Sequence, residues 1–230
     1  MGLPKLDIQR FKHKLTGIDK TITYRPFTVK EQKILLMAKE SEEREQEIEA
    51  MCQIIELCTD GAVDPKELPI FDIEDLFIKI RSKSVSDVCE IGYRVKDSDE
   101  RITITIPLDE VKVHIDPSHQ KKFMITETLG LVMKYPTLGM AFDSDSKIKR
   151  DDSMIRACID YVFDEDQVYN FSDFSEEEIN EWIESFDTSI LKKIANFFST
   201  MPTVKWETEV ELSDGRKTTI EFKGINSFFG

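Results

Sequence analysis

The stretch YRPFTVKEQKILLMA, residues 24–38, contains a junction between an extended segment and a helix. Thr28 followed three residues later by Glu31 matches the capping box, in which each side chain satisfies a free backbone amide near the other residue. Pro26 keeps Arg25 extended, because the residue before a proline disfavours the helical conformation. The sequence therefore predicts a strand that stops before Pro26 and a helix that Thr28 caps. Such a rigid joint requires no catalytic chemistry.

Further helices are predicted where apolar residues recur at helical spacing. Asp72 is the expected cap of one of them, and Ser175 with Glu178 forms a second capping box. Gly61 is the expected stop of the helix before it. The expected helices run from about Glu43 to Cys58, from Asp72 to about Ser84, across Ile155, Cys158, Ile159 and Val162, from Ser175 through a face of Ile179, Trp182, Ile183 and Phe186, and from Thr188 to about Ser199.

Strands are predicted where apolar and polar residues alternate between turn residues. The segments around 14–24, 89–95, 102–106, 111–115, 127–136 and 204–222 have this character. We expect 89–115 to form one small antiparallel sheet and 204–222 to form a hairpin around the Ser-Asp-Gly turn. Residues 127–136 also fit a helix, but their alternation favours a strand. The segment FDSDSKIKRDD, residues 142–152, is typical of a surface loop.

These elements predict an α+β protein of two lobes, residues 1–118 and 119–230. Each lobe is a small helical cluster followed by an antiparallel hairpin or small sheet. A shift of 115 residues aligns Asp72 with Asp187, Leu76 with Leu191, Ser98 and Asp99 with Ser213 and Asp214, and Arg101 with Arg216. An ancient duplication explains this recurrence, and so does the frequency of helix-then-hairpin arrangements. The sequence leaves both explanations open.

Charge and composition limit the function. The 45 acidic and 31 basic residues give a formal charge of -14, spread along the chain. A broad basic face for nucleic acid is therefore not expected, whereas protein partners with basic patches are. No apolar run is long enough to suggest a membrane span, and the charged N-terminal residues do not fit a signal peptide. The four scattered cysteines are typical of reduced thiols.

No pattern for a catalytic, metal or cofactor site is present. The motifs for serine hydrolases, P-loops, dinucleotide binding and zinc peptidases are all absent. The acidic run at Asp143 lacks the glycine and the glutamate of a calcium loop, since Ile148 and Met154 occupy those positions. We expect no enzymatic activity, no cofactor and no metal. A hydrolase stays an alternative, because its carboxylate pair would be defined by separation in space rather than in sequence.

Two short segments are candidates for contact with partner proteins. KIRSKS, residues 79–84, ends a predicted helix, where Arg81 and Lys83 complement the helix dipole or face a partner. The chain ends SFFG, and two adjacent aromatic rings are costly to leave in water. We expect Phe228 or Phe229 to fold against the lobe of Trp182, Phe186 and Phe198, and the other ring to contact a neighbouring protein. Burial of both rings in the chain's own core is the alternative.

The ordered set RPFTVKEQKILLMAKES, LFIKIRSKSVSD, MKYPT, IDYVFDEDQVY, FFSTMP and SFFG resembles the baseplate hub proteins of contractile-tailed bacteriophages of the T-even type. The similarity runs from about Tyr24 to the end of the chain and lies in order and spacing rather than in one motif. Members of that family help to build the central hub of the tail baseplate, as structural or assembly proteins without an established catalytic site.

The resemblance implies a non-enzymatic hub component in the virion, assembled in the host cytoplasm and bound to other hub and tail proteins, with a homo-oligomer as a further option. A transient assembly chaperone for the hub is the alternative within the same biology. The copy number, the symmetry and the direct partners do not follow from the sequence.

Overall fold

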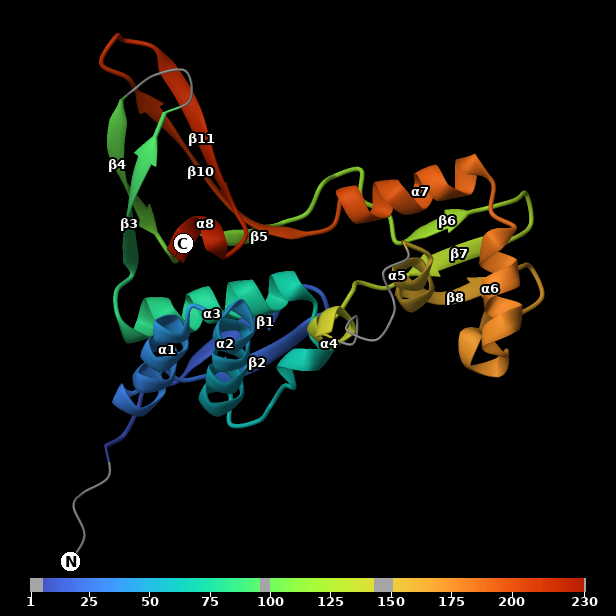
Figure 1. Ribbon diagram of the computed structural model, residues 1–230, viewed down its shortest axis with the longest axis horizontal. Coiled ribbons are helices and arrows are strands. Elements are labelled where there is room, and N and C mark those ends of the chain that lie inside the picture. The colour runs from blue at the N-terminus through green and yellow to red at the C-terminus, as the bar shows by residue number, and fades with distance from the viewer. Residues whose placement is uncertain (1–5, 96–99, 143–150, 230) are drawn as a thin grey trace, which may run out of the picture. The chain divides into compact units, whose positions relative to one another are not determined.

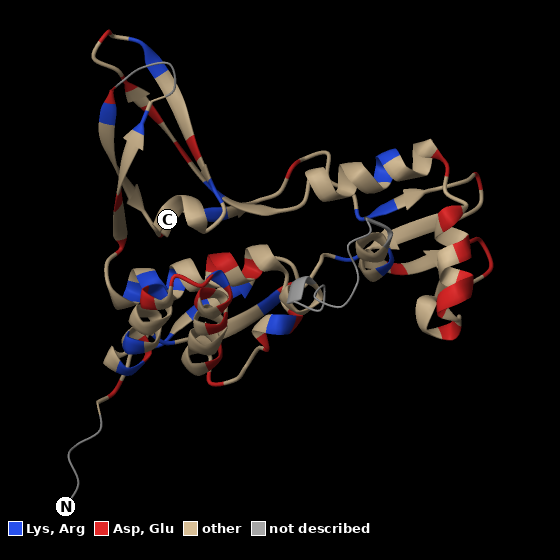
Figure 2. Ribbon diagram, viewed as in Figure 1, with Lys and Arg blue, Asp and Glu red and all other residues tan. Residues whose placement is uncertain are grey.

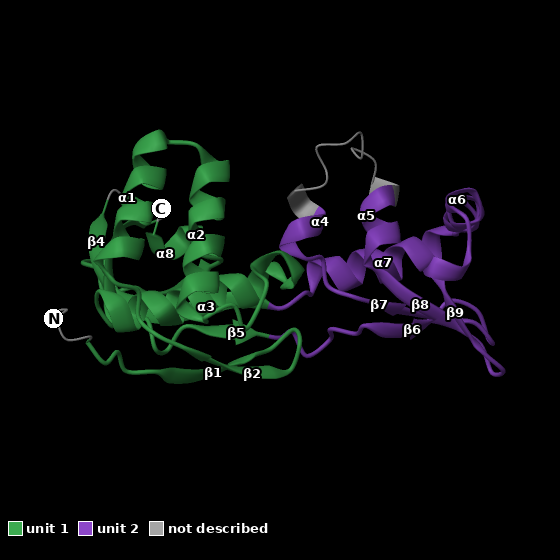
Figure 3. Ribbon diagram, turned by 90° about the horizontal axis from the view of Figure 1, so that it is seen from below, with its two compact units in different colours: residues 1–114, 203–230 green, residues 115–202 purple. Residues whose placement is uncertain are grey.

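The computed structural model describes residues 6–95, 100–142 and 151–229. The chain forms two compact units, which we call unit 1 (residues 1–114 and 203–230) and unit 2 (residues 115–202) (Figures 1 and 3). Both contain helices and small antiparallel sheets, which confirms the α+β class. Within the described ranges, no helix combines the length and the apolar character that crossing a membrane requires.

Unit 1 consists of three small sheets and a set of helices. Its sheets are β1–β2, β3–β4 and the three-stranded β11–β10–β5. In chain order its elements are β1 (Phe11–Leu15), β2 (Lys20–Tyr24), α1 (Val29–Ser41), α2 (Arg44–Cys58), the 3-10 helix η1 (Pro65–Glu67), α3 (Ile70–Ser84), β3 (Val88–Arg94), β4 (Arg101–Pro107), β5 (Lys112–His114), β10 (Thr203–Glu211), β11 (Lys217–Lys223) and α8 (Asn226–Phe229).

Unit 2 is built on one antiparallel sheet in the order β6–β7–β8–β9. Its core joins β7 and β8 to α6 and α7, with Leu131, Ile183 and Phe197 among the buried residues. In chain order its elements are β6 (Lys122–Met124), β7 (Gly130–Met133), α4 (Leu138–Phe142), α5 (Asp151–Cys158), β8 (Ile159–Phe163), β9 (Val168–Asn170), the 3-10 helix η3 (Phe171–Asp173), α6 (Glu176–Glu184) and α7 (Thr188–Ser199).

The junction before α1 has the predicted capping box. Glu31 accepts the backbone N–H of Thr28 at 2.7 Å, and its other oxygen lies 2.9 Å from Arg25 Nη2. The backbone N–H of Arg25 donates to the carbonyl of Cys58 at 2.9 Å, which attaches the junction to the end of α2. Burial would raise the pKa of Glu31, but the hydrogen bonds from Arg25 and Thr28 outweigh it and lower the pKa to about 2.

Helix α3 begins at Ile70 after Pro69, so the prediction that Asp72 caps it is wrong. Asp72 is fully buried within the first turn. Its carboxylate accepts backbone N–H groups from the β1–β2 turn, at 2.8 Å from Thr16 and 2.9 Å from Gly17. A Cβ on Gly17 would lie 2.7 Å from Asp72 Oδ2, so this approach requires glycine. The Asp72 carboxylate therefore accepts from free backbone amides, as a helix-capping side chain does. These amides belong to the β1–β2 turn and not to α3.

The core of unit 1 surrounds α3. This helix packs against α2, β1, β5 and β10 and has nine buried residues among its fifteen. One apolar cluster joins α3 to the β3–β4 hairpin, to the β10–β11 hairpin and to α8. Its buried members are Ile78, Ile104, Ile106, Leu108, Val111, Val204, Ile220, Phe222 and Phe228. The two sequence segments of unit 1 thus contribute to a single core.

Two of these local predictions need correction. The helix expected across residues 155–162 ends at Cys158, and Ile159 begins strand β8. Residues 159–163, IDYVF, are rich in β-branched and aromatic side chains, which favour a strand. Strand β7 is present as expected, but its four residues are all buried rather than alternately exposed. Residues 143–150 of the expected surface loop lie outside the described residues.

The expected division into residues 1–118 and 119–230 differs from the observed one. Strand β5 pairs with β10, with Thr203 opposite His114, and not with β4. This pairing brings residues 203–230 into unit 1. The sequence pattern predicts the β10–β11 hairpin, but it does not indicate which strand the hairpin pairs with. Both long hairpins therefore belong to one core, and the strand orders of the two units are unrelated. This arrangement argues against a duplication of two equivalent lobes.

The low pKa of Glu31 predicts a pH-dependent contribution to stability. A carboxylate whose folded pKa is lowered stabilises the fold above its ordinary pKa of 4.5, and the contribution is lost as the pH falls towards 2. We expect Glu31→Gln to reduce the free energy of unfolding by up to about 3 kcal/mol at pH 7. The difference from the unsubstituted protein should shrink below pH 4.5, as measured by urea denaturation. A difference independent of pH would contradict this assignment.

The contacts of Asp72 predict that its carboxylate oxygen atoms contribute to the stability of the fold. Asp72→Ala removes the acceptor of the Thr16 and Gly17 N–H groups and leaves a cavity at a fully buried position, and it should lower the free energy of unfolding by about 3 kcal/mol. Asp72→Asn keeps one acceptor and should cost about 1 kcal/mol. Asp87→Ala, at an exposed position after α3, is the control and should stay within about 0.5 kcal/mol. Equal denaturant midpoints for Asp72→Ala and the control would show that Thr16 and Gly17 have other partners.

Candidate protein interface

The candidate interface residues lie at the last turn of α3 and on α8, both in unit 1. Figure 1 shows α8 between α3 and the two long hairpins. The Arg81 guanidinium carbon lies 4.2 Å from the centre of the Phe229 ring, which is a cation–π contact. The Phe229 ring also meets Phe77 edge-on at 6.4 Å. The structure thus brings Arg81 and Phe229 together, although 148 positions separate them in the sequence.

Phe228 belongs to the core of unit 1. Its side chain is 1% exposed, and its ring lies 6.1 Å from that of Phe222. The thiol of Cys89 donates to its carbonyl oxygen at 3.1 Å. The expectation that one ring folds inward is met, but the lobe of Trp182, Phe186 and Phe198 is the wrong location. Those residues lie in unit 2, whereas the β10–β11 hairpin returns the chain end to unit 1.

Arg81 and Lys83 are both half-buried and differ in their polar contacts. Lys83 Nζ forms an ion pair with Asp109 at 2.7 Å and lies 5.8 Å from the Phe11 ring. The Lys83 ammonium lowers the pKa of Asp109 below its usual range. Arg81 Nη1, in contrast, is buried and has no hydrogen-bond partner among the described residues. Lys83 is therefore committed to a contact inside unit 1, whereas Arg81 has unused donor capacity.

Helix α1 has an apolar surface that the sequence analysis missed. Val29, Leu36 and Met37 are 68%, 54% and 70% exposed, and we call them the α1 patch. Positions 29, 36 and 37 lie on one side of a helix, because seven or eight residues make about two turns. The run ILLM at 34–37 was the available signal, since four consecutive apolar residues cannot all face one core.

The end of α3 adds exposed aliphatic side chains close to the start of α1. Val85 and Val88 are 58% and 40% exposed. The backbone N–H of Phe27 donates to Ser84 Oγ at 2.8 Å, which attaches the chain before α1 to the last turn of α3. We call Arg81, Lys83, Val85 and Val88 the α3 end. Its mixture of aliphatic and cationic groups is suited to protein contact.

Buried charged groups near the middle of α3 serve the fold. Lys79 Nζ donates to the carbonyl oxygens of Leu108 at 3.1 Å and Val111 at 2.6 Å, and burial lowers its pKa. His13 Nε2 lies 2.8 Å from Asp75 Oδ2. Burial, with the charges of Asp109 and Asp75, raises the pKa of Tyr24 to about 12, so its hydroxyl stays protonated. These groups hold segments of unit 1 together.

The described residues contain no group of three or more His, Cys, Asp or Glu side chains arranged to hold a metal ion. Burial raises the pKa of the thiols of Cys52, Cys58 and Cys158 to about 11, about 12 and about 11, so they remain protonated at neutral pH. A protonated buried thiol is a poor nucleophile and a poor metal ligand.

The two C-terminal phenylalanines should differ in their effect on stability. Phe228→Ala removes a fully buried ring and should lower the free energy of unfolding by about 3–5 kcal/mol. Phe229→Ala removes a half-buried ring and its contact with Arg81, and should cost only about 1–2 kcal/mol. Urea denaturation of both variants measures the difference. Equal losses would show that Phe229 belongs to the core as fully as Phe228 does.

Comparison with known proteins gives a family match that includes both units. No significant match is found for the chain among curated proteins or among solved structures. A family model described as T4 bacteriophage base plate protein matches residues 8–230. The match includes the junction before α1, the whole of unit 2 and the returning β10–β11 hairpin. The chain therefore belongs to the T4 bacteriophage base plate protein family.

Proposed function

We propose that this baseplate protein is a non-enzymatic structural component of the central hub, assembled in the host cytoplasm and held in the tail by contacts with neighbouring hub and tail proteins. The observation that carries the proposal is the family match over residues 8–230, which includes both units. Family membership indicates a component of the phage tail baseplate with a structural role. The hub location and the partner contacts are the proposed refinement.

The exposed apolar surface of unit 1 supports this role. The α1 patch and the α3 end present five large apolar side chains to solvent, and the hydrogen bond from Phe27 to Ser84 attaches the chain before α1 to the last turn of α3. Exposed apolar residues that cluster beside cations are typical of surfaces that bind other proteins. Arg81 lies one helical turn before Val85, and its guanidinium carbon is 4.2 Å from the centre of the Phe229 ring, which places both residues in the same part of unit 1. We propose these residues, with Phe229, as the contact surface of unit 1.

Retention in the particle distinguishes a hub subunit from a departing assembly chaperone. We expect quantitative mass spectrometry of purified mature tails to find the chain in fixed proportion to the other baseplate proteins. Presence in assembly intermediates but loss from mature tails would instead assign it as a chaperone.

The same assay tests the contact surface. Leu36→Glu and Met37→Glu alter exposed side chains and should change the free energy of unfolding by no more than about 0.5 kcal/mol. They should nevertheless reduce incorporation into tails, because a buried unpaired charge opposes association. Ala195→Glu, at an exposed position of α7 in unit 2, adds the same charge outside the α1 patch; it is the matched control and should incorporate normally. Normal incorporation of all three variants would exclude the α1 patch as a contact.

A further inference from the structure

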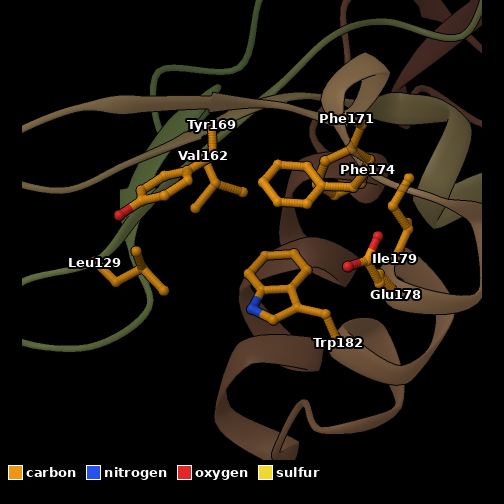
Figure 4. A pocket seen from close by; sticks show the side chains of 8 residues that line it. All are labelled: Leu129, Val162, Tyr169, Phe171, Phe174, Glu178, Ile179 and Trp182. Atoms are coloured by element: carbon orange, nitrogen blue, oxygen red, sulfur yellow. The ribbon is translucent and has the colours of Figure 1, made fainter.

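Unit 2 contains a pocket of about 340 Å³ that the proposed hub contacts do not involve. It lies between the β7–β9 part of the sheet, η3 and α6. Figure 4 shows Leu129 and Val162 on one side, Phe171 and Phe174 on the other, and Trp182 across from Tyr169. We call this the aromatic pocket. Its volume is at the small end of the ~300–1,000 Å³ range of ligand pockets, which suits one large side chain.

The walls of the aromatic pocket are apolar and held in place from behind. The Trp182 ring meets Phe171 edge-on at 5.8 Å and Phe186 edge-on at 4.7 Å. Phe174 is 42% exposed, so an aromatic face remains open to water. Fixed rings around an open apolar hollow are the features that bind an anchor side chain of a partner. Glu178 is the charged residue that lines the pocket.

The surroundings of the pocket are strongly acidic. Residues 160–187, which form β8, β9, η3 and α6, include eleven Asp or Glu and no Lys or Arg. Figure 2 shows the acidic residues along α6 and the adjoining loop. One of the carboxylates, Glu176, pairs with Arg156 at 3.3 Å. Glu178 accepts the backbone N–H of Ser175 at 2.8 Å, and this hydrogen bond lowers its pKa, so it remains charged.

Local structure explains part of this charge. Glu176, Glu177 and Glu178 lie in the first turn of α6, where negative charge complements the helix dipole. Asp187 caps α7, and Asp164 accepts backbone N–H groups of its own turn. These local roles leave two observations unexplained. Residues 160–187 contain no Lys or Arg, and α6 has further acidic side chains at positions 181 and 184, after its first turn. The segment therefore carries a net acidic excess, although Lys122 and Lys193 of other elements lie near Phe163 and Asp187.

We propose that the aromatic pocket binds a segment of a partner protein in which one aromatic or long aliphatic side chain is flanked by Lys or Arg. The apolar walls supply the contact for the anchor side chain, and the acidic surroundings attract the flanking cations. Nucleic acid and anionic lipid surfaces are disfavoured by the same charge. This inference concerns unit 2 alone and does not depend on the hub assignment.

The test uses the full chain and three synthetic pentapeptides with blocked ends, KRFKR, KRAKR and EDFDE. A Trp206→Phe variant leaves Trp182 as the single tryptophan, because the sequence has two. We expect KRFKR at millimolar concentration to change the Trp182 fluorescence saturably and to bind at least about tenfold more tightly than either other peptide. Added salt should weaken its binding. Calorimetric titration of the unsubstituted protein provides the same comparison without the Trp206 change.

Three substitutions test whether the peptide binds in the aromatic pocket. Leu129→Phe should fill the pocket and abolish KRFKR binding. Glu178→Gln keeps the capping box, which accepts glutamine, and should weaken binding severalfold, whereas Glu211→Gln in unit 1 is the charge-matched control and should not. Equal affinity for KRFKR and KRAKR, equal affinity for KRFKR and EDFDE, or no binding at all would overturn the proposal. Self-association of the protein that Leu129→Phe abolishes would also overturn it, by assigning the pocket to a second copy of the chain.

Discussion

The polar groups buried along α3 are the constraint on which unit 1 depends. A buried carboxylate or ammonium is tolerated only when other groups satisfy it. Asp72 obtains its donors from the β1–β2 turn, Lys79 obtains its acceptors from the loop after β4, and Glu74 accepts the backbone N–H of Ile225 at 3.2 Å. Segments near both ends of the chain are thus required around one helix. The apolar packing of α3 and the satisfaction of its charges select the same arrangement.

This arrangement nests one unit within the other along the sequence. Because His114 and Thr203 are opposite each other in the β5–β10 pair, unit 1 can close its core while residues 115–202 form a separate one. Among the residues that the structure describes, the two apolar clusters share no buried residue. The surfaces differ as well: unit 1 exposes aliphatic side chains beside Arg81, and unit 2 exposes aromatic rings amid carboxylates. The two proposed contact surfaces are thus built independently, one on each unit, and they differ in chemistry.

Local features of the fold could be predicted from the sequence because they depend on residues within four positions of one another. The capping boxes at Thr28 and Ser175 and the β10–β11 turn are of this kind. The binding partner of Asp72, the pairing of β5 with β10 and the location of Phe228 depend on residues more than 50 positions apart, and no local pattern specifies them. The candidate residues Arg81 and Phe229 could likewise be identified separately, but not their contact. The aromatic pocket was missed for the same reason, since Trp182 alone is indistinguishable from a core residue of a helix.

The central claim is that residues 203–229 fold with α3 rather than with the helices of unit 2 that precede them. Native-state hydrogen exchange, followed by mass spectrometry at increasing denaturant below the unfolding transition, measures this directly, because amides of one cooperative unit exchange with one opening free energy. We expect the β10–β11 hairpin, β4 and α3 to share one value, and β7 and α7 to share another. Exchange of β10–β11 together with α7, and apart from α3, would contradict the account.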